Sequence, residues 1–275
     1  MAGVNRILVD SRHRQPDSRS TTDFRVELPE TVTVEDNMCC VVSDICIPVS
    51  WYTIETDVND KLFLRVMRGI DYSDYIITLE SRNYTCSELV QAINDKFAAL
   101  NLPLDCNQDP FRNIIRITLT ASTYNQFMVL SNADLKTDYI KETWRGQYFS
   151  PTNPQSINEV IGNTDFKLNV YGSTKIYEGG QFNAIPHHTI YIVCPQLGTF
   201  RSIGPQGERD ILKKHVVMAN PSEISVDISL NAEDFTNISK LSLKSLQFRL
   251  TDVYGNVLNM HGQNWSFTLT IRPIP

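Results

Sequence analysis

Apolar and polar residues alternate with a period of two along much of the chain, which is the pattern of half-buried β-strands. The clearest case is the C-terminal segment, where Trp265, Phe267, Leu269 and Ile271 occupy alternate positions and therefore point to one face. We expect these four side chains to form part of a core. Further strands are predicted at 7–9, 22–28, 38–49, 62–67, 75–79, 114–119, 127–130, 166–170, 189–193, 211–218, 224–230 and 241–250.

A helical period is found in one region, 85–100. Thr85 and Glu88 have the spacing of a capping box, in which each side chain satisfies a backbone donor at the helix start. Apolar residues then follow at steps of four, four and three, which places them on one helix face. These predicted helix core residues are Leu89, Ile93, Phe97 and Leu100. With the strands on either side, the helix is expected to form a compact β-α-β-β unit.

Two breaks in this pattern are also predicted. Pro29 is expected to end the strand at 22–28. Residues 145–187 are rich in glycine and proline and are predicted to be mostly loops. This region carries the aromatic residues Tyr148, Phe149, Tyr171, Tyr177 and Phe182.

The composition supports a mostly β fold. The 275 residues include 20 Val, 25 Ile and 22 Thr against 9 Ala, and branched side chains lose rotamer freedom in helices while packing well on sheets. A helical bundle is thereby excluded. The net charge of −6 argues against a nucleic-acid-binding surface over the whole molecule. No apolar run reaches the roughly 18 residues of a membrane span, and residues 1–10 lack a secretory signal, so we expect a soluble protein.

Motifs for chemistry are lacking in the sequence. The six cysteines, among them Cys39, Cys40 and Cys46, are expected to be reduced and to behave as small hydrophobic residues. The five histidines are interpreted as polar loop residues, since the adjacent pair at 187–188 would point to opposite faces of a strand. We therefore predict no catalytic residue, no cofactor and no metal site.

One acidic segment resembles a calcium loop at first sight. Asp105, Asn107 and Asp109 follow the first three ligand positions, but Pro110 replaces the required glycine and Arg116 the final glutamate. The segment is predicted to be a loop after the helix without a bound ion.

Residues 1–22 are predicted to form a polar arm that contains four arginines and two aspartates. A solvated tail is one interpretation. The other is an arm that lies against a partner subunit or reaches nucleic acid.

Five segments in order carry a resemblance to a known family. They read ILVDSR at 7–12, STTDFRVELP at 20–29, VSDICIPVSWY at 42–52, NYTCSELVQAIN at 83–94 and FRLTDVYGNVLNMHGQNWSFTL at 248–269. In this order they resemble the penton (minor capsid) proteins of adintoviruses, animal viruses related to Maverick/Polinton elements and virophages.

The resemblance implies a single jelly-roll β-sandwich with an inserted smaller α+β or β-rich domain. Residues 1–69 and 186–275 would form the jelly roll, and 70–185 an inserted domain that projects outward. Homopentamers would occupy the five-fold vertices of an icosahedral virion, beside trimers of a double-jelly-roll major capsid protein, with the N-terminal arm available to neighbouring subunits. The projecting domain would be available to a host-cell receptor. The family offers no catalytic motif or cofactor.

Three alternatives concern function and domain organisation. The chain could be a β-sandwich binding module that recognises glycan or protein through the aromatic loops at 145–187. An enzyme of the double-stranded β-helix class would need two histidines two apart on one strand, which the sequence lacks. Finally, the helix could share one continuous core with the outer strands instead of belonging to a separate unit.

Overall fold

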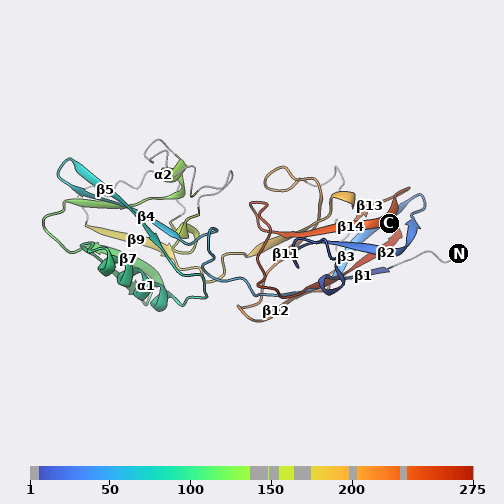
Figure 1. The fold of residues 1–275 in the computed structure, drawn as a ribbon, viewed down its shortest axis with the longest axis horizontal. Coiled ribbons are helices and arrows are strands. Elements are labelled where there is room, and N and C mark those ends of the chain that lie inside the picture. The colour runs from blue at the N-terminus through green and yellow to red at the C-terminus, as the bar shows by residue number, and fades with distance from the viewer. Residues whose placement is uncertain are drawn as a thin grey trace. The chain divides into compact units, whose positions relative to one another are not determined.

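Antiparallel β-strands account for most of the secondary structure. The computed structural model describes residues 6–136, 148, 155–163, 175–197, 203–229 and 234–274. The chain divides into unit 1, which joins Met1–Trp51 to His187–Pro275, and unit 2, Tyr52–Pro186. In Figure 1 the blue N-terminal and red C-terminal strands belong to unit 1, and the cyan to yellow middle of the chain belongs to unit 2.

Two antiparallel sheets make up unit 1. The first has the strand order β1-β15-β3-β12, with the short β13 also pairing with β3, and the second has the order β11-β10-β14-β2. The strands are β1 (Arg6–Asp10), β2 (Asp23–Thr33), β3 (Met38–Pro48), β10 (Thr189–Val193), β11 (Ile211–Val216), β12 (Ile224–Asp227), β13 (Thr236–Asn237), β14 (Ser242–Thr251) and β15 (Ser266–Pro273).

The two sheets of unit 1 enclose one core. Trp265 directly precedes β15, and it is buried there together with Phe267, Leu269 and Ile271 of that strand. Edge-to-face ring contacts join the sheets, because Phe267 lies 5.0 Å from Phe248 of β14 between ring centroids and Trp265 lies 5.8 Å from Phe24 of β2. All four residues that the alternation singled out thus lie in this core.

The strand β2 continues through Pro29, so the prediction that this proline ends the strand was wrong. β2 is an outer strand of the second sheet, and its pairing with β14 shifts register between Leu243 and Ser245. A proline is tolerated at such a bulge on an outer strand because no ladder hydrogen bond is lost. At this bulge the Lys244 ammonium donates a hydrogen bond to the carbonyl oxygen of Leu28 at 2.7 Å.

Residues 6–22 are part of unit 1, which corrects the interpretation of the N-terminal arm as a solvated tail, and the strand predicted at 7–9 is confirmed as β1. β1 pairs with β15 from Arg6 opposite Thr270 to Asp10 opposite Ser266. Ile7 and Val9, which occupy alternate positions of β1, point from one face of the strand into the core of unit 1. Backbone pairing and burial together hold this segment on the sandwich, in spite of its many arginines.

Two three-stranded sheets, the long helix α1 and the short helix α2 make up the described secondary structure of unit 2, apart from a 3-10 turn. The third sheet has the order β5-β4-β8 and the fourth the order β6-β7-β9. The elements of unit 2 are β4 (Lys61–Arg68), β5 (Asp71–Thr78), α1 (Cys86–Ala99), β6 (Leu104–Asp109), β7 (Ile114–Leu119), β8 (Gln126–Val129), α2 (Asn132–Lys136), a 3-10 turn at Ile157–Glu159 and β9 (Ile176–Gln181). Unit 1 contains two further 3-10 turns, at Ser11–His13 and Pro195–Leu197.

The predicted β-α-β-β unit is wrong in its connections. β5 and β8 both pair with β4, whereas β7 belongs to the other sheet with β6 and β9. The strands β6 and β9 were predicted as loops, because β6 is mostly polar and β9 contains two adjacent glycines. The strand predicted at 166–170 lies outside the described residues.

The first boundary between the units lies at Trp51–Tyr52 and not at 69–70 as the sequence suggested. The reason is β4, which pairs with β5 and β8 and buries Leu62, Leu64 and Val66 in the core of unit 2. Residues 52–69 therefore belong to unit 2. The alternation in this strand predicts its buried face but does not identify its partner strands.

The helix α1 begins as its sequence predicts. Thr85 is the N-cap, and the reciprocal hydrogen bonds of the capping box with Glu88 are both present. Leu89, Ile93 and Phe97 are buried in the core of unit 2. In Figure 1 α1 lies beside the strands of the fourth sheet, and its contacts are with β6 and β7.

Leu100 was predicted in the helix core, and this was wrong, because 47% of its surface is exposed. The helix ends at Ala99, and Asn101 takes a left-handed conformation with φ 51°. The Leu102 amide then donates to the carbonyl of Phe97 at 2.9 Å, which is the bond of a Schellman motif. Leu100 is therefore the C-cap at the end of the helix, beyond the buried residues of its apolar face.

Candidate functional site

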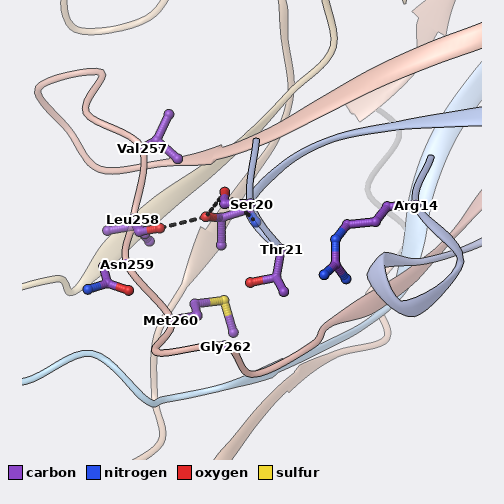
Figure 2. Close-up of a pocket in the computed structure, with 9 residues that line it drawn as sticks. Arg14, Ser20, Thr21, Val257, Leu258, Asn259, Met260 and Gly262 are labelled. Carbon is purple, nitrogen blue, oxygen red and sulfur yellow. Dashed lines mark hydrogen bonds between the residues drawn. The ribbon is translucent and has the colours of Figure 1, made fainter. Parts of the chain in front are cut away.

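A pocket lies within unit 1, between the N-terminal segment and the loop before β15. It measures about 480 Å³ and is lined from the two sides by Arg14 and residues 20–22 and by residues 257–260 and Gly262. Figure 2 shows Ser20, Thr21 and Arg14 on one side, with Leu258, Asn259 and Met260 on the other.

The polar groups at this pocket bond to their own chain. The Thr22 hydroxyl donates to the carbonyl oxygen of Leu258 at 2.6 Å, and the Trp265 indole N–H donates to the Thr21 carbonyl at 2.8 Å. Ser11 adds a third connection, because its Oγ accepts from the Trp265 amide at 3.1 Å. These bonds hold the N-terminal segment against the C-terminal strand and the loop before it. The pocket lies between the segments that these bonds join.

A buried polar cluster joins β11 to β12 at the rim of the sandwich. Lys213 and His215 alternate on β11 and both point inward, where they are almost fully buried. The Lys213 ammonium forms an ion pair with Asp234 and lies 3.6 Å from Asp227 of β12. His215 Nε2 and the Ser225 hydroxyl form a hydrogen bond of 2.8 Å. The cluster links the edges of the two sheets, since β11 and β12 belong to different ones.

Burial lowers the pKa of His215 below its ordinary value of 6.5, because the charged imidazolium would lose its hydration. Asp227 opposes this change and Lys213 reinforces it. The Nδ1 atom is buried and has no hydrogen-bond partner among the described residues. A serine nucleophile needs a histidine base that a third group orients. The His215–Ser225 pair is buried, and its hydrogen bond joins β11 to β12.

The interpretation of all histidines as loop residues was therefore wrong for His215, which lies in a strand and is buried. A period-two pattern over 211–216 places both Lys213 and His215 on the inner face, and this pattern could have predicted from the sequence that His215 is buried.

The six cysteines are free, and five of them are buried. Burial raises the pKa of Cys40 and of Cys194 to about 12, which keeps these thiols protonated.

Potential metal ligands do not gather in the described part of the chain. No group of three or more His, Cys, Asp or Glu side chains there could hold a metal ion. Asp105, Asn107 and Asp109, which have the spacing of a calcium loop, lie on strand β6 and not in a loop. The described residues also include no helix that is long and apolar enough to cross a membrane.

The aromatic residues at 145–187 do not make an exposed surface where they are described. Tyr177 is buried in the core of unit 2, and Phe182 packs against that core. Tyr148 packs against Phe63 and lies 5.5 Å from the Lys61 ammonium, measured to the ring centroid. Phe149 and Tyr171 lie outside the described residues. The aromatic loop surface expected for a binding module is thus not formed by the three described rings.

Exposed apolar residues instead gather on the outer strand β12 and just after it. Ile224, Val226 and Ile228 are 58%, 62% and 74% exposed. At the opposite edge of the same sheet, Leu8 of β1 is 78% exposed. The two strands are the outer strands of the first sheet, and Figure 1 labels both. The sequence predicted these strands, but it did not predict that they form the edges.

The structure is similar to that of the mavirus penton protein. The likeness covers 98% of this chain and 99% of that chain, with a TM-score of 0.48 and 11% sequence identity. No family model matches the sequence, and no curated protein matches it.

Proposed function

We propose that this chain is a structural capsid protein that forms homopentamers at the five-fold vertices of an icosahedral virion. In this proposal unit 1 is a single jelly roll and unit 2 is an insertion that projects from it. Trimers of a double-jelly-roll major capsid protein surround each pentamer. The chain carries out no catalysis in this role.

The observation that carries the proposal is the nested pairing of the strands in unit 1. Leaving the short β13 aside, eight strands follow one another along the chain as β1, β2, β3, β10, β11, β12, β14 and β15. The first pairs with the last, the second with the seventh, the third with the sixth and the fourth with the fifth, all antiparallel. A jelly roll is such a long folded ribbon wrapped into two facing sheets.

The segments that resemble adintovirus pentons support the same proposal. Those at 7–12, 20–29, 42–52 and 248–269 fall on β1, β2, β3, β14 and β15. These strands are neighbours in the sheets, since β15 lies between β1 and β3 and β14 lies beside β2. Segments far apart in the sequence thus contribute to a single sandwich.

Unit 2 is inserted between the third and fourth strands of this ribbon, β3 and β10. Its two ends meet, because the Thr53 hydroxyl donates to the carbonyl oxygen of Ala184 at 2.9 Å. In unit 1 the flanking Trp51 and His187 rings also touch, with centroids 6.0 Å apart. An insertion with adjacent ends leaves the host strands undisturbed, as a projecting domain requires.

The mass of the purified full chain in solution tests the proposal. Light scattering after size exclusion should give about 157 kDa, five times the 31.3 kDa of one chain. Negative-stain images of the same peak should show five-fold rings. A stable monomer at high protein concentration, or rings of another symmetry, would contradict it.

A second role, attachment to a host cell through unit 2, is favoured by two residues at its hairpin tips. Ile70 and Phe111 lie between β4 and β5 and between β6 and β7, and each is 99% exposed. Binding residues lie disproportionately on loops that a rigid scaffold positions, and these two apolar side chains at hairpin tips are accessible to a partner. If this is correct, a variant with Ile70→Ser and Phe111→Ser should lose binding to host cells while its mass in solution stays unchanged.

A further inference from the structure

The first sheet of unit 1 has two different outer strands, β1 at one edge and β12 at the other. β1 and β12 each pair with a strand on one side only, among the described residues. Outer strands with unpaired backbone groups and apolar side chains tend to associate with another chain unless charge or proline blocks them.

We propose that β12 of one copy contacts β1 of the next copy, and that this edge-to-edge contact builds the ring. The inference rests on the proposed pentamer and names the surfaces that form it. A ring of identical subunits needs a heterologous contact between two different surfaces of each chain. The two opposite edges of one sheet provide such a pair.

Both edges carry exposed apolar side chains on the same outer face of the sheet. On β12 the exposed Ile224 and Val226 project from the outer face, while Ser225 and Asp227 point inward. On β1 the exposed Leu8 projects from the same outer face of the sheet, because Ile7 and Val9 point into the core. If the sheet continues from one copy to the next, Leu8 therefore reaches the apolar side chains of β12.

The charges of the two edges are also complementary. Residues 6–14 contain three arginines and one aspartate. Residues 223–229 contain no basic residue, and their one carboxylate besides the inward-pointing Asp227 is that of Glu223. Antiparallel pairing of Leu8 with Val226 brings Glu223 level with Ser11, next to Arg12, and Arg12 and Glu223 are both exposed. A second copy of this chain thus provides both the apolar contact and the opposite charge that the β12 edge needs.

Strand direction allows the two edges to pair. β1 is antiparallel to β15, β15 to β3, and β3 to β12. β1 therefore runs antiparallel to β12 within one sheet. A second copy that continues the sheet in the same orientation presents its β1 to β12 in the antiparallel sense, which is the arrangement that adjacent outer strands most often adopt.

Cysteine trapping tests the contact in the full chain. The double variant Leu8→Cys with Val226→Cys, under mild oxidation, should give a ladder on a non-reducing gel that ends at five chains. Each single variant should give no ladder, because its one new thiol would face the unchanged Val226 or Leu8 of the neighbouring copy. The wild type controls for the native thiols, of which Cys46 is the least buried.

A substitution that keeps the fold provides the second measurement. Val226 is 62% exposed, so Val226→Lys should leave the melting temperature unchanged and lower the mass fivefold, from about 157 to 31.3 kDa. The matched control Phe111→Lys replaces an apolar residue that is 99% exposed in unit 2 and should leave the mass unchanged.

The outcomes separate this inference from the proposed function. A wild-type mass of about 157 kDa without a ladder, or with Val226→Lys still pentameric, overturns the edge contact and leaves the ring. A ladder that runs beyond five chains supports the contact and contradicts the pentamer. A wild-type monomer with no ladder at any concentration overturns both.

Discussion

Trp265 connects three parts of unit 1 through its side chain and its backbone carbonyl. Its ring stacks on Phe267 with centroids 5.1 Å apart and meets Phe24 edge to face. Its indole N–H donates to the carbonyl of Thr21, and its backbone carbonyl accepts from Ser11. The N-terminal segment, β2 and β15 therefore all depend on this residue.

We expect Trp265→Ala to lower the free energy of unfolding by about 3–5 kcal/mol, through lost burial, a cavity and an unpaired Thr21 carbonyl. Urea unfolding followed by circular dichroism measures this. The control Ile203→Ala removes a side chain that is 68% exposed and should change stability by less than about 0.5 kcal/mol. Equal stability of the Trp265 variant and the wild type would refute a core role for Trp265.

His215 should make the stability of the protein depend on pH. Its folded-state pKa lies below the ordinary 6.5 of the unfolded chain, so the unfolded state binds more protons as the pH falls through that range. The free energy of unfolding should therefore decrease from pH 7.5 to pH 5.5. The groups that face the ring are Lys213 on its own strand and Ser225 and Asp227 on β12.

The variant His215→Gln should show a shallower decrease over the same pH interval, because the titrating group is gone. Chemical unfolding at several pH values gives the slope. His261→Gln is the control, since His261 is exposed, and it should keep the wild-type slope. Identical slopes for all three proteins would exclude His215 as the source of the pH dependence.

At the scale of elements, two glycines allow the segment 155–163 to approach β9. Gly162 has φ +69°, and a Cβ placed on it would lie 2.5 Å from the Cα atom of Gly180 in β9. The Gly180 amide donates to the Gly162 carbonyl at 3.2 Å. Close backbone contact of this kind requires the absence of a side chain.

Gly162→Ala should therefore destabilise the protein more than Gly69→Ala does. Gly69 has a nearly equal φ of +66° but no atom within 4 Å of its Cβ position, so its substitution reports the backbone strain alone, about 1–2 kcal/mol. The difference between the two variants in urea unfolding measures the clash. If both variants lose the same stability, the contact with Gly180 is looser than it is in this structure.

Sequence patterns predicted some elements well and others not at all. The helix α1 was predictable because its cap at Thr85 and its apolar face lie within 15 residues of one another. β15 was predictable because both faces follow a strict alternation. β6 and β9 were missed because a strand with mostly polar residues or glycines is stabilised by its neighbours in the sheet, and those lie elsewhere in the sequence.

At the scale of the whole molecule, each unit has its own hydrophobic core. Replacing residues 52–186 with a short Gly/Ser linker should therefore leave unit 1 folded, because Trp51 and His187 already touch. Circular dichroism should retain a cooperative thermal transition, and light scattering should show the ring at a reduced mass. Aggregation of the shortened chain, beside a soluble full-length control, would mean that the two units depend on each other.

The sequence alone determined which faces of the strands are buried and where the one long helix begins, because both depend on residues that are close along the chain. Only the tertiary structure decided which strands pair, where unit 2 starts, and that the arginine-rich N-terminal segment lies on the sandwich. It also brought Lys213, His215 and Ser225 together and left Leu8 and Val226 at open edges. These features depend on backbone pairing between residues as far apart as Arg6 and Thr270, for which a local pattern carries no signal.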